Sequence, residues 1–179
     1  MHRYLLAVLA FVFVAASPGE AQQPYAGLQA RPIKALSEQQ IADLKAGRGM
    51  GLALAAELNG YPGPIHLLEL SDKVGLSDQQ RAQITSLFEA MKAEAVPLGE
   101  NLLALETDLD AQFKNRTITA ESLKGTTATI GEVQAALRNT HLKYHLFTVA
   151  LLAPAQIKHY EALRGYSAAS HDDHQGTHH

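Results

Sequence analysis

One apolar stripe constrains the fold of this chain more than any other feature of its sequence. Between residues 84 and 113, apolar side chains recur at steps of three and four positions, which keeps them on one face of an α-helix. The stripe therefore predicts a single long helix that begins after Ser77 and is kinked, without being ended, by Pro97. The residues of the stripe are Ile84, Leu87, Met91, Ala95, Leu98, Leu102, Leu105, Leu109 and Phe113.

A second periodic segment follows after a short turn at 115–118. Thr119 is placed to cap a helix, and an apolar or aromatic residue then recurs every seven positions, the spacing of a helix–helix seam. These seam residues are Leu123, Ile130, Leu137, Tyr144 and Leu151. Two such helices predict an antiparallel hairpin with arms about 50 Å long. A hairpin of that length leaves apolar surface uncovered in a monomer, so we expect a dimer or an exposed apolar face.

The rest of the sequence predicts short helices and two unstructured ends. We expect a flexible leader over 22–35 and a disordered, His-rich tail over 166–179. The helical domain then spans 36–165, and its expected class is all-α, an elongated antiparallel hairpin of four to five helices. Three shorter helices are expected beside the two long ones, over residues 37–58, 65–74 and 155–163.

The N-terminus has the pattern of a cleavable secretory signal peptide. His2 and Arg3 form a short basic region, an apolar run extends from Leu5 to Ala16, and small residues suited to cleavage follow at 19–21. Residues 1–21 are therefore expected to be removed, and the mature protein is expected in a bacterial periplasm. The alternative is an uncleaved membrane anchor, although the apolar run is shorter than the about 20 residues that span a bilayer.

The composition excludes several classes of protein. The 179 residues include no Cys, which removes disulfides, thiolate metal sites and a Cys nucleophile. With 15 Lys and Arg against 18 Asp and Glu, the formal net charge is -3, and an acidic chain is not expected to bind nucleic acid. No catalytic residues are predicted, because the sequence contains no Gly-x-Ser-x-Gly, His-Glu-x-x-His or Ser-x-x-Lys motif. We therefore do not expect an enzyme.

A short phrase repeats at the starts of three predicted helices. Leu-Ser-x-x-Gln occurs at 36–40 and at 76–80, and 152–156 is a weaker third copy with Ala153 in place of Ser. Its physical basis is a capping box, in which the Ser hydroxyl accepts from a backbone N–H of the first turn. The Gln side chain reaches back to the N–H of the cap residue. Helix capping alone explains every residue of the phrase.

The second and third copies also match a known family motif. The residues concerned are Leu76, Ser77, Gln80, Leu152 and Gln156. They resemble the Leu-Thr-x-x-Gln motif of the Spy/CpxP family of periplasmic stress-response chaperones, with Ser77 and Ala153 where the family has Thr. The resemblance covers about residues 36–165 and implies a four-helix subunit that dimerises into a curved cradle. It also implies that unfolded client proteins are held on the concave face without ATP.

Histidines form a second group of candidate functional residues. His141 and His145 share one face of the predicted helix, and His66 and Glu69 form another such pair. This spacing suits a divalent metal such as Zn, Ni, Co or Cu. The CnrX-type heavy-metal sensors related to the Spy/CpxP family use a later His-x-x-x-His or His-x-x-x-Met pair, which 141–145 resembles. The alternative is structural, because histidines beside a helix seam usually pack their rings and hydrogen-bond a neighbour.

The C-terminal tail carries four more histidines beside Asp172 and Asp173. A flexible His-rich tract binds metals loosely, because ordering each ligand costs entropy. We expect a weak metal-buffering segment here, and a solvated tail without a role is the alternative. The histidines are His171, His174, His178 and His179.

Two functional hypotheses follow. The first is an ATP-independent periplasmic chaperone that binds unfolded or misfolded clients and requires no cofactor. The alternative is a periplasmic sensor or buffer of heavy metals, which binds a divalent metal and, as a sensor, works with a membrane sensor protein. A homodimer is expected in either case, and a purely structural helical dimer is a third reading.

Overall fold

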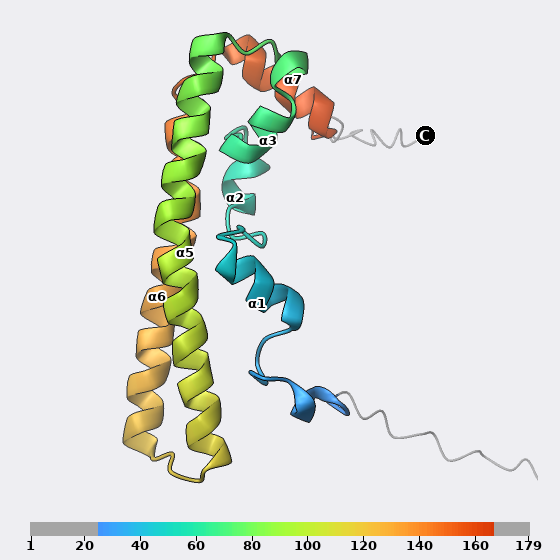
Figure 1. The fold of residues 1–179 in the computed structure, drawn as a ribbon. Helices are drawn as coiled ribbons and strands as arrows, with labels where there is room; N and C mark the ends of the chain where they lie inside the picture. The colour runs from blue at the N-terminus through green and yellow to red at the C-terminus, as the bar shows by residue number, and fades with distance from the viewer. Residues whose placement is uncertain (1–24, 167–179) are drawn as a thin grey trace, which may run out of the picture.

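The computed structural model describes residues 25–166, and these residues are built from helices without any strand (Figure 1). The all-α class predicted from the sequence is thereby confirmed for this part of the chain. The predicted signal peptide, 1–21, lies outside the described residues. In chain order the elements are η1 (Leu28–Ala30), α1 (Glu38–Lys45), α2 (Leu54–Glu57), α3 (Pro64–Glu69), α4 (Ser71–Val74), α5 (Asp78–Lys114), α6 (Ala120–Val149) and α7 (Pro154–Arg164).

Helix α5 is the long helix that the apolar stripe predicts. It contains 37 residues, with Pro97 inside it, and would measure about 56 Å at 1.5 Å per residue. The stripe is buried along the middle of the helix and emerges at its C-terminal end, where Phe113 is exposed. Buried members of the stripe are Ile84, Met91, Ala95 and Leu102. The period of the apolar residues therefore identifies the buried face correctly over most of the helix.

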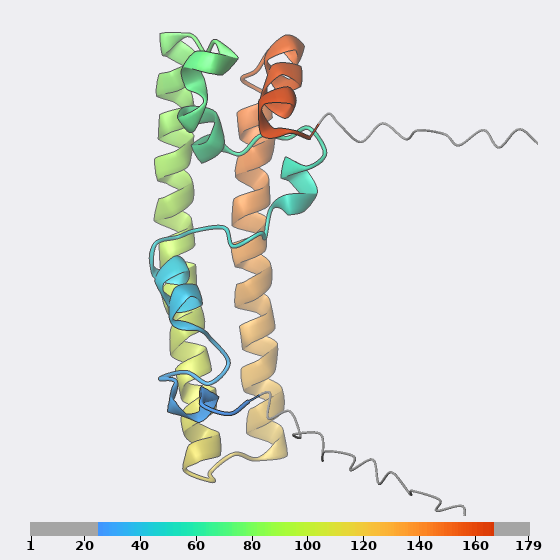
Figure 2. The ribbon, with the colours of Figure 1, turned by 90° about the vertical axis from the view of Figure 1, so that its right-hand side faces the viewer.

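Helix α6 lies beside α5 and runs in the opposite direction (Figures 1 and 2). Thr119 caps it as predicted, because the hydroxyl of Thr119 accepts from the backbone N–H of Ser122 at 3.1 Å. The seven-residue seam is buried where it faces α5. Its buried members are Ile130, Leu137 and Tyr144, and Leu123 near the turn is exposed.

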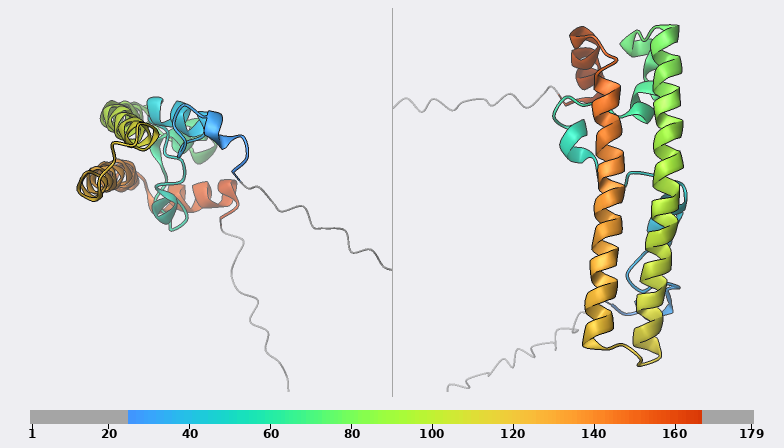
Figure 3. Two further views of the ribbon diagram at one scale, coloured as in Figure 1. Left: turned by 90° about the horizontal axis from the view of Figure 1, so that it is seen from below. Right: turned by 90° about the vertical axis from the view of Figure 1, so that its left-hand side faces the viewer.

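The other elements all lie against one face of the α5–α6 pair (Figures 2 and 3). Helices α1 and α3 pack on α5, α2 packs on α6, and α4 contacts α7. In the right-hand view of Figure 3 the opposite face of the pair is covered by none of the other described elements. The molecule is therefore two-sided, with its short helices gathered on one side of a long helical pair.

The first predicted helix, 37–58, is interrupted. Helix α1 ends at Lys45 and α2 begins at Leu54, and the turns between them contain Gly47 and Gly51 at φ of 65° and 81°. A positive φ ends an α-helix, and glycine adopts it without a steric penalty. The second predicted helix, 65–74, is also divided, because α3 ends before Leu70 and α4 begins after it.

The predicted boundaries of the helical domain are too narrow at both ends. Ile33, inside the expected flexible leader 22–35, is buried in the same hydrophobic cluster as Leu44 and Leu103. Tyr166, the first residue of the expected tail, packs against a second cluster and donates a hydrogen bond to Glu57. The leader and tail assignments are therefore wrong at these two residues. The sequence missed them because their partners lie far along the chain.

Two hydrophobic clusters hold the elements together. The larger cluster joins the segment around Ile33 and α1 to the middle of α5 and α6. The smaller one joins α3, α4, the start of α5 and α7. At the larger cluster, the C-terminal end of α1 approaches the backbone of α5 at Gly99. A Cβ there would lie 2.9 Å from the carbonyl carbon of Leu44, so only glycine permits this crossing.

Candidate functional site

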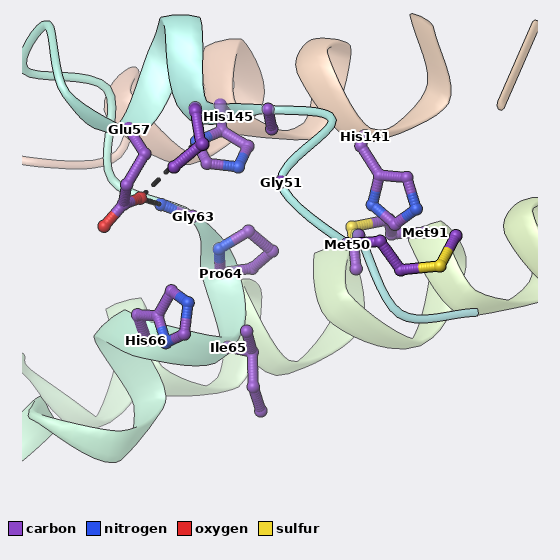
Figure 4. Close-up of a pocket in the computed structure, with 13 residues that line it drawn as sticks. Met50, Gly51, Glu57, Gly63, Pro64, Ile65, His66, Met91, His141 and His145 are labelled. Carbon is purple, nitrogen blue, oxygen red and sulfur yellow. Dashed lines mark hydrogen bonds and ion pairs between the residues drawn. The ribbon is translucent and has the colours of Figure 1, made fainter. Parts of the chain in front are cut away.

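A pocket of about 190 Å³ opens between α2, the start of α3, α5 and α6 (Figure 4). His66, His141 and His145, three of the four tentative metal ligands, all line this one pocket. Glu69 does not line it, and its carboxylate instead lies 3.0 Å from Nδ1 of His66. No group of three His, Asp or Glu side chains suited to a metal occurs within residues 25–166. The four tail histidines lie outside that range.

His145 is held by a backbone carbonyl. Its Nδ1 lies 2.6 Å from the carbonyl oxygen of Tyr61, and since a carbonyl only accepts, Nδ1 carries the proton. The lone pair of a neutral His145 is therefore on Nε2. This atom abuts the backbone at Gly63, where a Cβ would lie 2.9 Å away. The structural reading of His145, a ring that hydrogen-bonds a neighbour, is confirmed for Nδ1.

His141 is different, because its Nε2 is buried and has no hydrogen-bond partner in the described part of the chain. The residue is only 3% exposed. A buried polar atom without a partner costs about 1 to 3 kcal/mol. Burial, and secondly the charge of nearby His145, lower the pKa of His141, so its ring is neutral at neutral pH. His141 therefore has a buried ring nitrogen, Nε2, that makes no hydrogen bond within the described residues.

Glu57, a residue that the sequence patterns do not single out, is the buried carboxylate of this region. Its Oε2 accepts from the backbone N–H of Gly63 at 3.0 Å. Its Oε1 accepts from the hydroxyl of Tyr160, and from the hydroxyl of Tyr166 at 3.2 Å. The Nε of Arg164 lies 3.8 Å from the same oxygen. Glu57 thus joins α2 to α7 and is fully engaged by other protein groups.

Tyr160 is the other half of this buried contact. Its side chain is fully buried, and burial together with the hydrogen bond to Glu57 raises the pKa of Tyr160 far above its usual range. The hydroxyl therefore remains a proton donor at any ordinary pH. One sequence signal was available for this contact, because Glu57 is the only charged residue between positions 49 and 65.

Two methionines complete the pocket on the side of His141 (Figure 4). Met91, on α5, is 6% exposed, whereas Met50, in the turn between α1 and α2, is 41% exposed. Met50 has a φ of 44°, which costs a residue with a β-carbon about 1 to 2 kcal/mol. The apolar stripe predicted Met91 as a packing residue, and no sequence pattern identified Met50. These are the only internal methionines of the chain.

The family-motif residues form a separate cluster at the end of the pair where α5 begins. Ser77 and Gln80 make the predicted capping box, with both hydrogen bonds present at 3.0 and 3.1 Å. The Oε1 of Gln156 accepts from the N–H of Ala153 at 3.0 Å. Leu76 is buried in the smaller hydrophobic cluster, and Leu152 packs against it.

The two motif glutamines also bind each other. Nε2 of Gln80 donates to Oε1 of Gln156 at 2.9 Å and to the carbonyl of Leu151 at 2.8 Å. Nε2 of Gln156 donates to Oε1 of Gln80 and to the carbonyl of Gly75, both at 3.0 Å. Helix capping, which was sufficient to explain the phrase from sequence, therefore accounts for only two of the six hydrogen bonds that these two side chains make.

A shallow apolar groove of about 270 Å³ lies over α2 and α6. Its lining is entirely apolar or aromatic, and Leu146 in it is 54% exposed. Other large apolar side chains of these segments are also exposed, namely Leu54 in α2, Leu58 directly after it and Phe147 in α6. The apolar groove is made of Ala55, Ala56, Tyr61, Leu142 and Leu146.

Comparison with protein-family models, with curated proteins and with solved structures finds no match for the chain. Within residues 25–166, no helix combines the length with the apolar character that crossing a lipid bilayer requires.

Proposed function

We propose that this protein is an ATP-independent chaperone that holds unfolded or misfolded clients in the periplasm. The observation that carries the proposal is the apolar groove, in which Tyr61 and Leu146 are exposed although they are large and apolar. Contiguous exposed apolar surface on a helical protein is typical of a site that binds other proteins. Apolar side chains of an unfolded client would be buried in this groove, with no nucleotide needed for binding or release.

The architecture supports the same function. The α5–α6 pair is a long antiparallel hairpin with one uncovered face, as a subunit of a dimeric cradle of the Spy/CpxP type requires. Residues Leu76, Ser77, Gln80, Leu152 and Gln156 would then be the family motif in its structural role. Phe113, exposed beside the 115–119 turn, extends the apolar surface available to a second subunit of a homodimer.

A light-scattering assay tests the chaperone proposal. Aggregation of reduced α-lactalbumin is followed without ATP in the presence of the full chain, Leu146→Ser or Leu123→Ser. We expect stoichiometric wild-type protein and Leu123→Ser to suppress aggregation, and Leu146→Ser to need several-fold more protein. Circular dichroism should show the same helix content in all three, because both leucines are exposed. Absence of suppression by the wild-type protein would contradict the proposal.

A second candidate function is binding of a heavy metal by the pocket, as a buffer or as a sensor that informs a membrane protein. It is favoured by the unpartnered Nε2 of His141 in a pocket that His66 and His145 also line. Zinc and nickel are titrated calorimetrically into the full chain, His141→Ala and His159→Ala. His159 is an exposed residue of α7. We expect His141→Ala to weaken binding at least tenfold and His159→Ala to leave it unchanged. Equal affinities for all three proteins would exclude the pocket.

A further inference from the structure

We propose that the pocket takes a soft monovalent cation, Cu(I) or its analogue Ag(I), held by the imidazole of His141 and the thioether sulfurs of Met50 and Met91. This inference deepens the second candidate function and rests on it. It differs from the divalent site predicted from sequence in its ion and in two of its three donors.

The first argument is the convergence of the donors. The chain has three methionines, and both internal ones line this pocket although Met50 belongs to the turn after α1 and Met91 to α5. His141 comes from a third element, α6, and Figure 4 shows its ring directed toward the two methionines. Thioether sulfur is a soft donor that selects Cu(I) over Zn, Ni and Co, whereas imidazole accepts all of them.

The second argument is charge. His141 and the two methionines are neutral donors, and the buried carboxylate of the pocket, Glu57, is already occupied by Gly63, Tyr160 and Tyr166. The desolvation free energy of burying an ion grows with the square of its charge, so it is about four times as large for a divalent ion as for a monovalent ion of the same size. A site without a free carboxylate therefore suits an ion of charge +1.

The third argument is the state of His141. Its Nε2 is buried without a partner, so a bound cation would satisfy an atom that the fold leaves unsatisfied.

Packing alone accounts for one methionine and not for the other. Met91 is buried within the apolar stripe of α5, where a flexible side chain fills space. Met50 is 41% exposed and has a left-handed backbone, so neither burial nor local conformation favours methionine there. A role for its sulfur explains the residue. Gly49 beside it lets the turn approach the ring, since a Cβ there would lie 3.3 Å from Nδ1 of His141.

The test is a silver titration of the full chain labelled with ¹³C in the methionine methyl groups, in chloride-free buffer. The N-terminal methionine is the internal reference. We expect the signals of Met50 and Met91 to shift together with one equivalent of Ag(I), and the signal of Met1 to stay in place. In His141→Gln the shift of both signals should require at least tenfold more silver.

Leucine variants separate thioether ligation from metal binding in general. Met50→Leu and Met91→Leu conserve side-chain volume and should retain the helix content of the wild type. We expect each to weaken Ag(I) binding about tenfold and to leave zinc affinity within about twofold. Silver bound without methyl shifts, or equally well by the leucine variants, would overturn this inference. If zinc still binds in a His141-dependent way, the second candidate function survives that result; if neither ion binds at the pocket, both fail.

Discussion

The side-chain amides of Gln80 and Gln156 donate hydrogen bonds to each other's oxygen atoms, at 2.9 and 3.0 Å, across 76 positions of the chain. Each of these oxygens also accepts from the cap residue of its own helix, Ser77 or Ala153. The starts of α5 and α7 are therefore tied together by the residues that cap them. Gln40 makes the same capping contact at α1, and its hydrogen bonds in the described structure are local.

This relationship predicts unequal effects for equal substitutions. Gln80→Ala removes a capping contact together with the donors to Gln156 and Leu151, so we expect the free energy of unfolding to fall by about 2 to 3 kcal/mol. Gln40→Ala removes only a capping contact and should cost about 1 kcal/mol or less. Urea denaturation measures both. The double variant with Gln156→Ala should be less destabilised than the sum of its parts, and strict additivity would refute the pairing.

Loss of Glu57 should destabilise the protein strongly. Glu57→Ala leaves the hydroxyls of Tyr160 and Tyr166 and the N–H of Gly63 without their acceptor, so we expect a loss of about 3 kcal/mol. Glu132→Ala, on the exposed face of α6, should change stability by less than about 0.5 kcal/mol. Thermal or urea unfolding compares the two variants, and similar stabilities would contradict a buried role for Glu57.

Two glycine-to-alanine substitutions should change the free energy of unfolding in opposite directions. In Gly99→Ala the new Cβ meets the backbone of Leu44, so α1 and α5 must separate, and we expect a loss of more than about 2 kcal/mol. In Gly131→Ala, in the interior of α6, the new Cβ meets nothing within 4 Å. Its higher helix propensity should stabilise the protein by up to about 1 kcal/mol. If both variants were stabilised, the close approach of α1 would be wrong.

Stability should fall in mild acid because of His141. Burial, and then the charge of His145, lower the pKa of His141 below its ordinary 6.5. Below pH 6.5 the unfolded chain therefore binds a proton that the folded chain does not, until the pH reaches the lower folded pKa. The contribution is complete above pH 6.5 and is lost as the pH falls, by up to about 1.4 kcal/mol per pH unit.

Denaturation between pH 7.5 and 5 measures that slope. His141→Gln cannot titrate, so its stability should depend less steeply on pH than that of the wild type. His159→Gln, at an exposed position of α7, is the matched control and should keep the wild-type slope. Identical slopes for the wild type and His141→Gln would show that His141 is solvated rather than buried.

The long helices could be predicted from sequence because their signal is local and repeated. The stripe of α5 and the seam of α6 each continue through many turns, and one helical face satisfies the whole pattern. The short helices depend on partners elsewhere in the chain. The turns that end α1 pack Gly47 against Val96 of α5, a contact with no signature in the residues around position 47.

The candidate site could likewise be predicted only where its residues follow a local spacing rule. The spacing rules identified two pairs, His141 with His145 and His66 with Glu69, and all of these residues except Glu69 line one pocket. Glu57 was not identified because its partner Tyr160 lies 103 positions away, and Met50 was not identified because it belongs to none of the periodic patterns. The composition did contain a signal for each residue. Glu57 is a single charged residue in an apolar segment, and Met50 is one of only two internal methionines.

The turn at 115–119 also sets an order of assembly. Pairing of α5 with α6 closes the shortest loops next to this turn and progressively longer ones away from it, so we expect the pair to zip from the turn outward. The contact between Gln80 and Gln156 closes a loop of 76 residues and belongs to the last stage. During synthesis α2 emerges from the ribosome before α6, the helix on which it packs, has been made. A newly made chain therefore carries α2 without its partner helix until α6 has been made, whereas the main partner of α1 and α3 is α5, which is made earlier.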